Sequence, residues 1–277
     1  MPQPSAPLAF DFNDLAARFD RFLPQIHPVG LAVLERLPAS AAGTSVLDVA
    51  CGTGEPGLTL ARRSPSVSLL GVDQAEALLG VAQGKVAQEG LANARFAVMG
   101  MDALTLADAS VDAVISRFGL LMFGDVAASA RELARVLRIG GAFSLAVWDD
   151  PATNTLMSAL LTALRDHLPR DWRSPMESLA EWAGEGRRTR LLEALGLSVR
   201  SEMFGWEYRF ESFDEPWEMV TAMGKFTGQA ELAVETQQLV RRALMAALEQ
   251  YRRPDGGYAI PHACRLIWGE RAAGTAG

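Results

Sequence analysis

Short apolar runs alternate with amphipathic segments from about residue 45 to residue 148. The runs at 67–72 and 142–148 are nearly continuous in apolar residues, as strands buried on both faces are. Strands that alternate with helices are typical of a parallel sheet covered on both faces. We therefore predict a doubly wound α/β core. The expected strands lie near 45–50, 67–72, 94–98, 111–116 and 142–148, and the expected helices near 55–63, 74–89 and 125–137.

Helical patterns flank this core on both sides. Before it, Phe10, Leu15 and Phe19 fall at roughly helical spacing, and a second helix is expected near 29–37, before Pro38. After residue 150 the regular alternation stops. There we expect helices near 153–168, 187–195, 214–226 and 229–252, an irregular stretch to about 185, and strands near 197–210 and 258–268.

The expected elements form three parts of one domain. Residues 1–40 form an N-terminal helical lid, and residues 41–150 form the ligand-binding core. Residues 151–277 supply cap helices, together with the sixth and seventh strands that complete the same sheet. We expect the cap to cover the carboxyl edge of the sheet, where open α/β sheets bind their ligands.

Composition and charge narrow the class of partner. The 277 residues are 49% hydrophobic and 21% charged, with a net charge of −7. A nucleic-acid backbone is bound by clustered Lys and Arg, so we expect a small molecule and no nucleic acid. No apolar run reaches the ~20 residues that span a bilayer, and a cytoplasmic location is expected. Two cysteines, Cys51 and Cys264, and three dispersed histidines predict no metal site.

A glycine-rich turn follows the first predicted strand. Gly52, Gly54 and Gly57 have the spacing of the dinucleotide-binding fingerprint, and Asp73 lies about 20 residues further on, where a ribose-binding acid is expected. Glycine lets the backbone approach a ligand closely and permits positive φ. This spacing alone leaves an NAD-dependent oxidoreductase open as an alternative. Asp48 adds negative charge at the turn, whereas a pyrophosphate prefers a helix N-terminus without it.

Further motifs in the same order resemble those of the class I S-adenosylmethionine-dependent methyltransferases. The glycine turn is followed by an acid after the second strand, an acid after the third strand, and Ser116-Arg117-Phe118-Gly119 after the fourth. The small-molecule members, such as the ubiquinone/menaquinone C-methyltransferase and secondary-metabolite groups, are the most similar. The resemblance implies a seven-stranded, mostly parallel Rossmann-like sheet whose seventh strand is antiparallel. Ile139 stands where the family usually has proline.

The resemblance also implies the cofactor, S-adenosyl-L-methionine, with S-adenosyl-L-homocysteine as product. It assigns Asp48 to the amino-acid end, Asp73 to the ribose hydroxyls and Asp102 to the adenine amino group. Simpler roles remain open, since Asp73 can cap a helix, Asp102 can start a turn and Arg117 can be an ion-pair arginine. The implied cofactor-binding residues are Asp48, Ala50, Cys51, Gly52, Gly54, Asp73, Gln74, Met101, Asp102, Ser116, Arg117 and Phe118.

The acceptor is expected to be a small, largely apolar or aromatic metabolite, methylated at carbon, oxygen or nitrogen. In-line displacement depends on positioning and needs a base only if the acceptor loses a proton. A protein that binds the cofactor without transferring a methyl group remains a second alternative, since no catalytic base is evident. The candidate bases are His27, His167 and His262, each more simply a structural histidine. The expected substrate pocket is lined by Phe19, Met122, Phe123 and Trp148.

Overall fold

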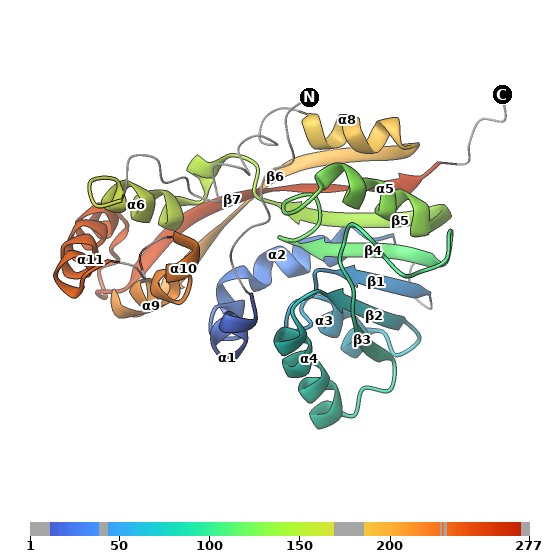
Figure 1. The fold of residues 1–277 in the computed structure, drawn as a ribbon, viewed down its shortest axis with the longest axis horizontal. Coiled ribbons are helices and arrows are strands. Elements are labelled where there is room, and N and C mark those ends of the chain that lie inside the picture. Colours follow the sequence, from blue (N-terminus) through green and yellow to red (C-terminus); the bar gives the residue numbers. More distant parts are fainter. Residues whose placement is uncertain (1–11, 39–43, 169–185, 228, 230–231, 273–277) are drawn as a thin grey trace.

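The computed structural model describes residues 12–38, 44–168, 186–227, 229 and 232–272. Its centre is a seven-stranded sheet of order β3-β2-β1-β4-β5-β7-β6 (Figure 1). The prediction of a doubly wound seven-stranded sheet is confirmed. The strands are β1 (Ser45–Val49), β2 (Ser68–Asp73), β3 (Ala94–Val98), β4 (Val111–Arg117), β5 (Leu137–Val147), β6 (Leu197–Phe210) and β7 (Tyr258–Arg271).

The strand order reverses beside β1, and this reversal locates the ligand crevice. The chain runs outward from β1 to β2 and β3 and then returns to place β4 on the other side of β1, with all these pairs parallel. Crossover connections leave a crevice at such a point, at the carboxyl ends of the strands. The glycine-rich turn after β1 and the exit of β4 therefore lie next to each other.

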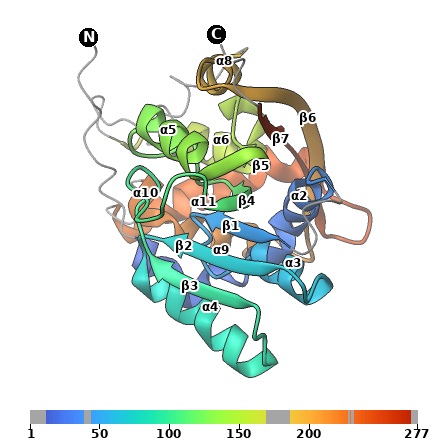
Figure 2. The same ribbon diagram turned by 90° about the vertical axis from the view of Figure 1, so that its right-hand side faces the viewer.

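Helices cover both faces of the sheet. Right-handed crossovers place α3 (Gly57–Arg63) and α4 (Glu76–Glu89) on one face, and α5 (Val126–Val136) on the other because β5 is added in the opposite direction. Figure 2 shows α2 (Leu23–Glu35) on the same side as α3 and opposite α5. Buried apolar side chains of β1, β4 and β5 fill the space between these layers.

The last two strands extend the sheet into a support for the cap. β7 pairs antiparallel with β5 only over residues 265–270, but with β6 along the full length of that 14-residue strand. The protruding part carries α6 (Thr155–Leu164), α9 (Asp214–Ala222), α10 (Gly224–Thr227) and α11 (Val234–Leu248) beyond the carboxyl ends of the parallel strands (Figure 1). Helical insertions before and after the sixth strand, and an antiparallel seventh strand, are thus confirmed.

The N-terminal segment differs from the expected pair of helices. A 3-10 turn at Phe12–Leu15 and a short α1 (Ala16–Phe19) precede α2, which begins at Leu23 and continues through Pro28. The expectation that the second helix begins near residue 29 was wrong. A proline removes one backbone N–H donor, but the helix continues through Pro28 on its other hydrogen bonds. The spacing of apolar residues does not reveal this continuation.

Other boundaries shift by a few residues. β5 begins at Leu137, directly after α5, because Leu137 already pairs with Val111 before a register shift. The expected helix at 229–252 is shorter, since α11 ends at Leu248 and a 3-10 turn follows. The irregular stretch expected to about 185 and the residue Phe10 lie outside the described residues. Of the described helices, none combines the length and apolar character needed to cross a membrane.

Three further short elements belong to the described part of the chain. They are the 3-10 turns Pro151–Thr153 and Glu249–Tyr251 and the helix α8 (Arg187–Ala194), which packs beside β6.

Candidate functional site

The glycine-rich turn after β1 has a backbone that most side chains would not tolerate. Gly52 and Gly54 have φ values of +54° and +99°, and Ala50 also lies in the left-handed region at 55°. A Cβ on Gly54 would lie 2.6 Å from Cδ1 of Leu58, so α3 packs directly against the turn. The turn thus exposes main chain rather than side chains toward the carboxyl edge of the sheet.

Asp48 supports this turn from behind. Its Oδ2 accepts a hydrogen bond from the N–H of Gly57 at 3.0 Å, which joins β1 to the start of α3. Its Oδ1 is buried and has no hydrogen-bond partner among the described residues. Burial raises the pKa of Asp48 to about 8, against the opposing effects of the Gly57 hydrogen bond and the charge of Arg117. A positive charge close to Asp48 would favour its ionised form.

Asp73 ends β2 and touches the same turn. Its Oδ2 accepts from the N–H of Gly52 at 2.9 Å, and its Oδ1 accepts from the N–H of Ala75 at 2.9 Å, before α4. Burial raises its pKa, opposed by the hydrogen bonds it accepts. Each carboxylate oxygen has a further lone pair for a hydroxyl donor. The helix-capping role and a ligand-binding role are therefore compatible.

Carboxylates occupy the amino end of α3. Asp48 accepts from Gly57, and Oε2 of Glu55 accepts from the N–H and the hydroxyl of Thr59 at 3.0 and 2.7 Å. These contacts use the amide groups that a phosphate at a helix N-terminus would require. The amino end of α3 is therefore not open to a pyrophosphate.

The exit of β4 brings Ser116, Arg117 and Phe118 to the other side of the crevice. The buried Ser116 hydroxyl donates to the carbonyl of Val49 at 2.7 Å and accepts from the N–H of Leu120 at 3.0 Å, so it fixes β4 against β1. Phe118 has a φ of 60°, a strained value for an aromatic residue. This turn directs Arg117 toward α2, while Phe118 stacks on Trp148 after β5.

The residues expected beside an adenine lie at the ends of β2 and β3. Gln74 and Asp102 are exposed, and Met101 is half-buried against the core. Asp102 approaches the loop after β4, because a Cβ on Gly124 would lie 3.9 Å from its Oδ2. Cys51 is buried in the turn itself, and burial raises the pKa of its thiol. The implied adenosine residues thus lie along one edge of the sheet.

The N-terminal segment crosses this edge. The Asn13 side chain accepts from the N–H of Ala77 at 2.8 Å, and a Cβ on Gly52 would lie 3.8 Å from Cε1 of Phe19. Phe12 makes an edge-to-face contact with Phe123, with ring centroids 5.9 Å apart. We call residues 12–20 the strap. It reaches the glycine turn, the start of α4 and the loop after β4.

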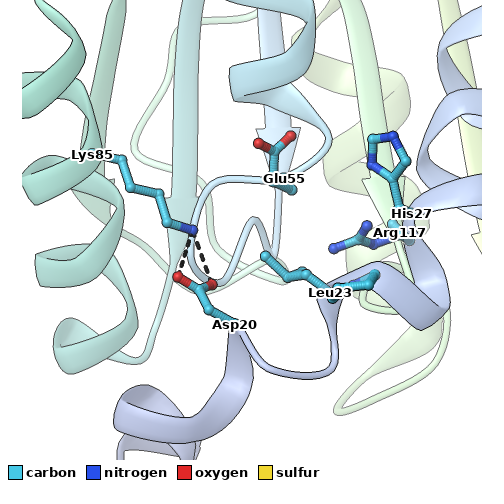
Figure 3. A pocket seen from close by; sticks show the side chains of 7 residues that line it. Asp20, Leu23, His27, Glu55, Lys85 and Arg117 are labelled. Carbon is cyan, nitrogen blue, oxygen red and sulfur yellow. Dashed lines mark hydrogen bonds and ion pairs between the residues drawn. The ribbon is translucent and has the colours of Figure 1, made fainter. Parts of the chain in front are cut away.

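A cavity of ≈ 570 Å³ lies between the strap, α2 and the glycine turn. Figure 3 shows Lys85 and Asp20 paired on one side of it, Glu55 in the middle, and His27 with Arg117 on the other side. The Nζ of Lys85 donates to Asp20 and to the carbonyl of Thr53, both at 2.9 Å, and Thr53 donates to Asp20 at 2.6 Å. The cavity is lined by Asp20, Leu23, Pro24, His27, Glu55, Lys85 and Arg117.

An aromatic cluster continues from the exit of β4 toward the cap. The rings of Phe118 and Trp148 are stacked, with centroids 4.5 Å apart and ring planes inclined by 4°. Trp206 lies 5.5 Å from Trp148 and donates from Nε1 to the carbonyl of Gln25 in α2. Tyr208 stacks on His262 at 3.8 Å, and burial raises the pKa of its phenol. Of the predicted substrate-pocket residues, Trp148 joins this cluster, Phe19 lies on the strap, Phe123 contacts Phe12 of the strap, and Met122 is buried in the core.

The three histidines have different surroundings. His27 is exposed and lines the cavity. His167 is exposed after α6 and is not one of the residues that line the cavity. His262 is buried, where Nε2 accepts from the N–H of Leu156 at 3.4 Å and Nδ1 lies 3.0 Å from the carbonyl of Ile260. The structure therefore brings one of the three, His27, to the cavity.

The sequence motifs did not indicate Asp20, Lys85, Trp206 or Tyr208. Lys85 has no motif around it, and its partner Asp20 lies 65 positions away. The alternation of aromatic residues at 204, 206, 208 and 210 is a recognisable signal, since side chains at i and i+2 share one face of a strand. It identifies an aromatic face but not the partner that covers it.

The fold and this turn define a Rossmann-like methyltransferase architecture, and comparison with known proteins agrees. Residues 46–141 match the family model described as "Methyltransferase domain". Demethylmenaquinone methyltransferase of Deinococcus radiodurans is 32% identical over 164 residues, which cover 57% of this chain and 67% of that protein. The enzyme of the same name from Thermus thermophilus is 34% identical over 135 residues, covering 47% of this chain and 60% of that protein.

Solved structures share the fold over nearly the whole chain. The YcgJ protein of Bacillus subtilis superposes with a TM-score of 0.61 at 21% identity, covering 90% of this chain and 99% of that one. The chain belongs to the class I S-adenosylmethionine-dependent methyltransferases. It spans 60% and 67% of the length of the two curated relatives above.

Proposed function

We propose that this protein transfers a methyl group from S-adenosyl-L-methionine to a small, largely apolar or aromatic metabolite and releases S-adenosyl-L-homocysteine. One observation carries the proposal. The glycine turn has carboxylates at Asp48 and Glu55 on the amides that a phosphate would need, and Asp73 lies hydrogen-bonded beside it. A sulfonium ligand with an ammonium group and a ribose fits this combination of charge and acceptors.

In the proposed complex the adenosine lies along the ends of β2 and β3. Asp73 accepts the ribose hydroxyls, and Gln74, Met101 and Asp102 surround the adenine. The amino-acid end lies at the glycine turn, close to Ala50, Cys51, Gly52 and Gly54. Asp48 supports the turn from behind, and Ser116 holds β4 at the distance from β1 that this arrangement needs. The strap covers the bound cofactor and limits the access of water.

Methyl transfer is a single displacement. The acceptor's electron pair forms the new bond to the methyl carbon while the bond from carbon to sulfur breaks, and the sulfonium becomes a neutral thioether. The protein contributes by alignment, which supplies roughly 7–11 kcal/mol in well-oriented model reactions. Where a neutral acceptor loses a proton, His27 is the base we propose, since it lines the cavity. The aromatic cluster around Phe118 and Trp148 supports an apolar or aromatic acceptor.

An NAD-dependent oxidoreductase is not favoured. It would place a pyrophosphate at the amino end of α3, where Asp48 and Glu55 already accept from the backbone amides. The net charge of −7 likewise supports a small-molecule acceptor rather than nucleic acid. The protein is proposed to act in the cytoplasm.

Two measurements test the proposal. Calorimetry is expected to show binding of S-adenosyl-L-homocysteine and none of NAD or NADH. Incubation with methyl-labelled S-adenosyl-L-methionine and fractionated small-molecule extracts is then expected to yield a labelled product. Absence of cofactor binding would refute the proposal as a whole. Binding without a labelled product from any extract would favour a protein that uses the cofactor without methyl transfer.

A further inference from the structure

Arg117 is a buried guanidinium with little to satisfy it. Its exposed fraction is 8%, and the hydrogen bond that it makes within the described residues is a long one, from Nη1 to the carbonyl of Ile26 at 3.4 Å. In the described part of the chain, Arg117 forms no ion pair with a carboxylate, and Asp48 and Glu55 act on it only as nearby charges. A buried arginine usually has a hydrogen-bonded anion beside it, because removing the charge from water is costly. The partner is therefore missing from the described side chains.

The surroundings accommodate Arg117 instead of excluding it. A Cβ on Gly30 of α2 would lie 3.2 Å from Nη1 of Arg117 and 3.2 Å from Cβ of Pro56. The absence of a side chain at Gly30 lets α2 lie directly over the guanidinium. Burial lowers the pKa of Arg117 to about 10, while the nearby charges of Asp48 and Glu55 oppose that shift, so the group remains cationic at neutral pH.

The other charged groups of the cavity are already engaged. Lys85 is paired with Asp20. Glu55 is paired with Arg62 at 2.6 Å and also accepts from Thr59. Among the described residues that line the cavity, Arg117 is thus the cation that has no anion as a hydrogen-bond partner. Figure 3 shows its guanidinium directed into the cavity below His27.

We propose that Arg117 binds the carboxylate of the ligand that fills this cavity. A guanidinium can hold a carboxylate through two parallel N–H donors, and such charge-assisted pairs are stronger than neutral hydrogen bonds. The inference rests on the proposed function, which supplies two possible sources of the carboxylate. One is the methionine part of the cofactor, and the other is an acidic group on the acceptor.

Calorimetry with two cofactor-derived ligands tests the first source. S-adenosyl-L-homocysteine carries the carboxylate, whereas 5′-methylthioadenosine keeps the adenosine and the thioether but lacks the amino-acid end. In Arg117→Gln we expect about ten- to hundred-fold weaker binding of the first ligand and unchanged binding of the second. Arg138→Gln is the matched control, because Arg138 is half exposed and pairs with Asp112 at the opposite end of β4.

A second arm tests the acceptor. Tryptophan fluorescence of protein saturated with S-adenosyl-L-homocysteine is titrated with benzoate and with benzamide, which differ in the carboxylate. Unchanged affinity of Arg117→Gln for the cofactor product, together with selective loss of benzoate binding, would place the carboxylate on the acceptor. Either selective loss supports the proposal and identifies its source.

The proposal and the proposed function fail in different ways. Suppose that the wild-type protein binds the cofactor product. The carboxylate role is then refuted, while the function stands, if Arg117→Gln binds every ligand as the wild type does. It is also refuted if the affinities for both ligands of a pair fall equally. If the Gln variant does not fold, Arg117→Lys replaces it. One ammonium cannot form two parallel bonds, so the preference for the carboxylate ligand should fall several-fold, and an unchanged preference in both pairs refutes the proposal.

Discussion

The carboxylate of Asp73 joins the end of β2 to the glycine turn, because its Oδ2 accepts from the N–H of Gly52 at 2.9 Å. The same side chain accepts from the N–H of Ala75 ahead of α4. One residue therefore fixes the spacing between two adjacent strand ends while each of its oxygens keeps a further lone pair for another donor. A loss of Asp73 should affect both the local structure and the ligand.

We expect Asp73→Ala to weaken S-adenosyl-L-homocysteine binding by about a hundred-fold, since two ribose hydroxyls lose a charged acceptor. Asp73→Asn should have an intermediate effect, because one acceptor oxygen remains. Calorimetry measures both. Asp125→Ala is the matched control, because Asp125 accepts from the N–H of Ala128 at the start of α5, on the other face of the sheet. It should lose about 1 kcal/mol of stability without a change in affinity. Equal losses of affinity in Asp73→Ala and in the control Asp125→Ala would contradict a ribose contact.

Gly54→Ala should destabilise the protein by about 2 kcal/mol or more. The residue has a φ of +99°, and the added methyl would approach Cδ1 of Leu58 to 2.6 Å. Gly84→Ala is the control within the same domain, because no heavy atom lies within 4 Å of a Cβ at Gly84 in α4. We expect that change to stabilise by about 0.5–1 kcal/mol through helix propensity. Urea unfolding measures both, and a neutral Gly54→Ala would show that the turn can relax.

The core of the fold could be predicted from sequence because its signals are local. The strand residues at 67–72 and 142–148 are apolar runs, and the acids that follow the strands are ordered along the chain. Which acids bind ligand stays a prediction, as does the boundary between lid and core near residue 40. The pattern failed at Pro28 and at Leu137, where the helix and strand continue because of bonds that spacing does not record.

The remaining parts of the site depend on distant contacts. Trp206 reaches the carbonyl of Gln25, 181 positions earlier, and Lys85 reaches Asp20 across 65 positions. No periodicity or motif specifies such a pair, since each side chain alone fits an ordinary surface or core position. The surroundings of Arg117 likewise depend on where α2 lies. The need for a glycine at position 30 follows only from the packing of α2 against Arg117.

Asp149 is the anion between two guanidiniums at the end of β5. Its Oδ1 lies 3.2 Å from Nη1 of Arg188, which is 3% exposed, and its Oδ2 accepts from Nε of Arg265 at 2.6 Å. Asp149→Ala would leave a buried cation uncompensated and should cost about 3–5 kcal/mol. Adding Arg188→Met should recover part of this loss. Asp150→Ala, at an exposed neighbouring acid, should cost about 1 kcal/mol or less. Similar losses at both positions would contradict the pairing.

The contact of Asp20 with Thr53 and Lys85 holds the strap on the glycine turn. In the proposed complex the cofactor leaves past this strap, so Asp20→Ala is expected to speed the dissociation of S-adenosyl-L-homocysteine by several-fold, with a smaller change in overall stability. Stopped-flow displacement measures the rate. Arg21→Ala serves as control, since the neighbouring Arg21 is exposed and its Nη1 lies 3.9 Å from Oε2 of the exposed Glu218. If the two variants release the product at the wild-type rate, the strap is a fixed part of the fold and not a lid.

His262 makes the stability of the folded protein depend on pH. It is buried against Tyr208, accepts from the N–H of Leu156, and burial lowers its pKa to about 4 from 6.5. Between these values the unfolded chain binds a proton that the folded protein does not, so stability is full above pH 6.5 and falls as the pH decreases toward 4. The loss should approach about 3 kcal/mol at its limit. Urea unfolding of wild type and His262→Gln from pH 7.5 to pH 4.5 isolates this contribution, because other titrating groups are common to both. The stability difference between the two proteins should shift in favour of the variant as the pH falls, whereas parallel profiles would show that folding does not lower the pKa of His262.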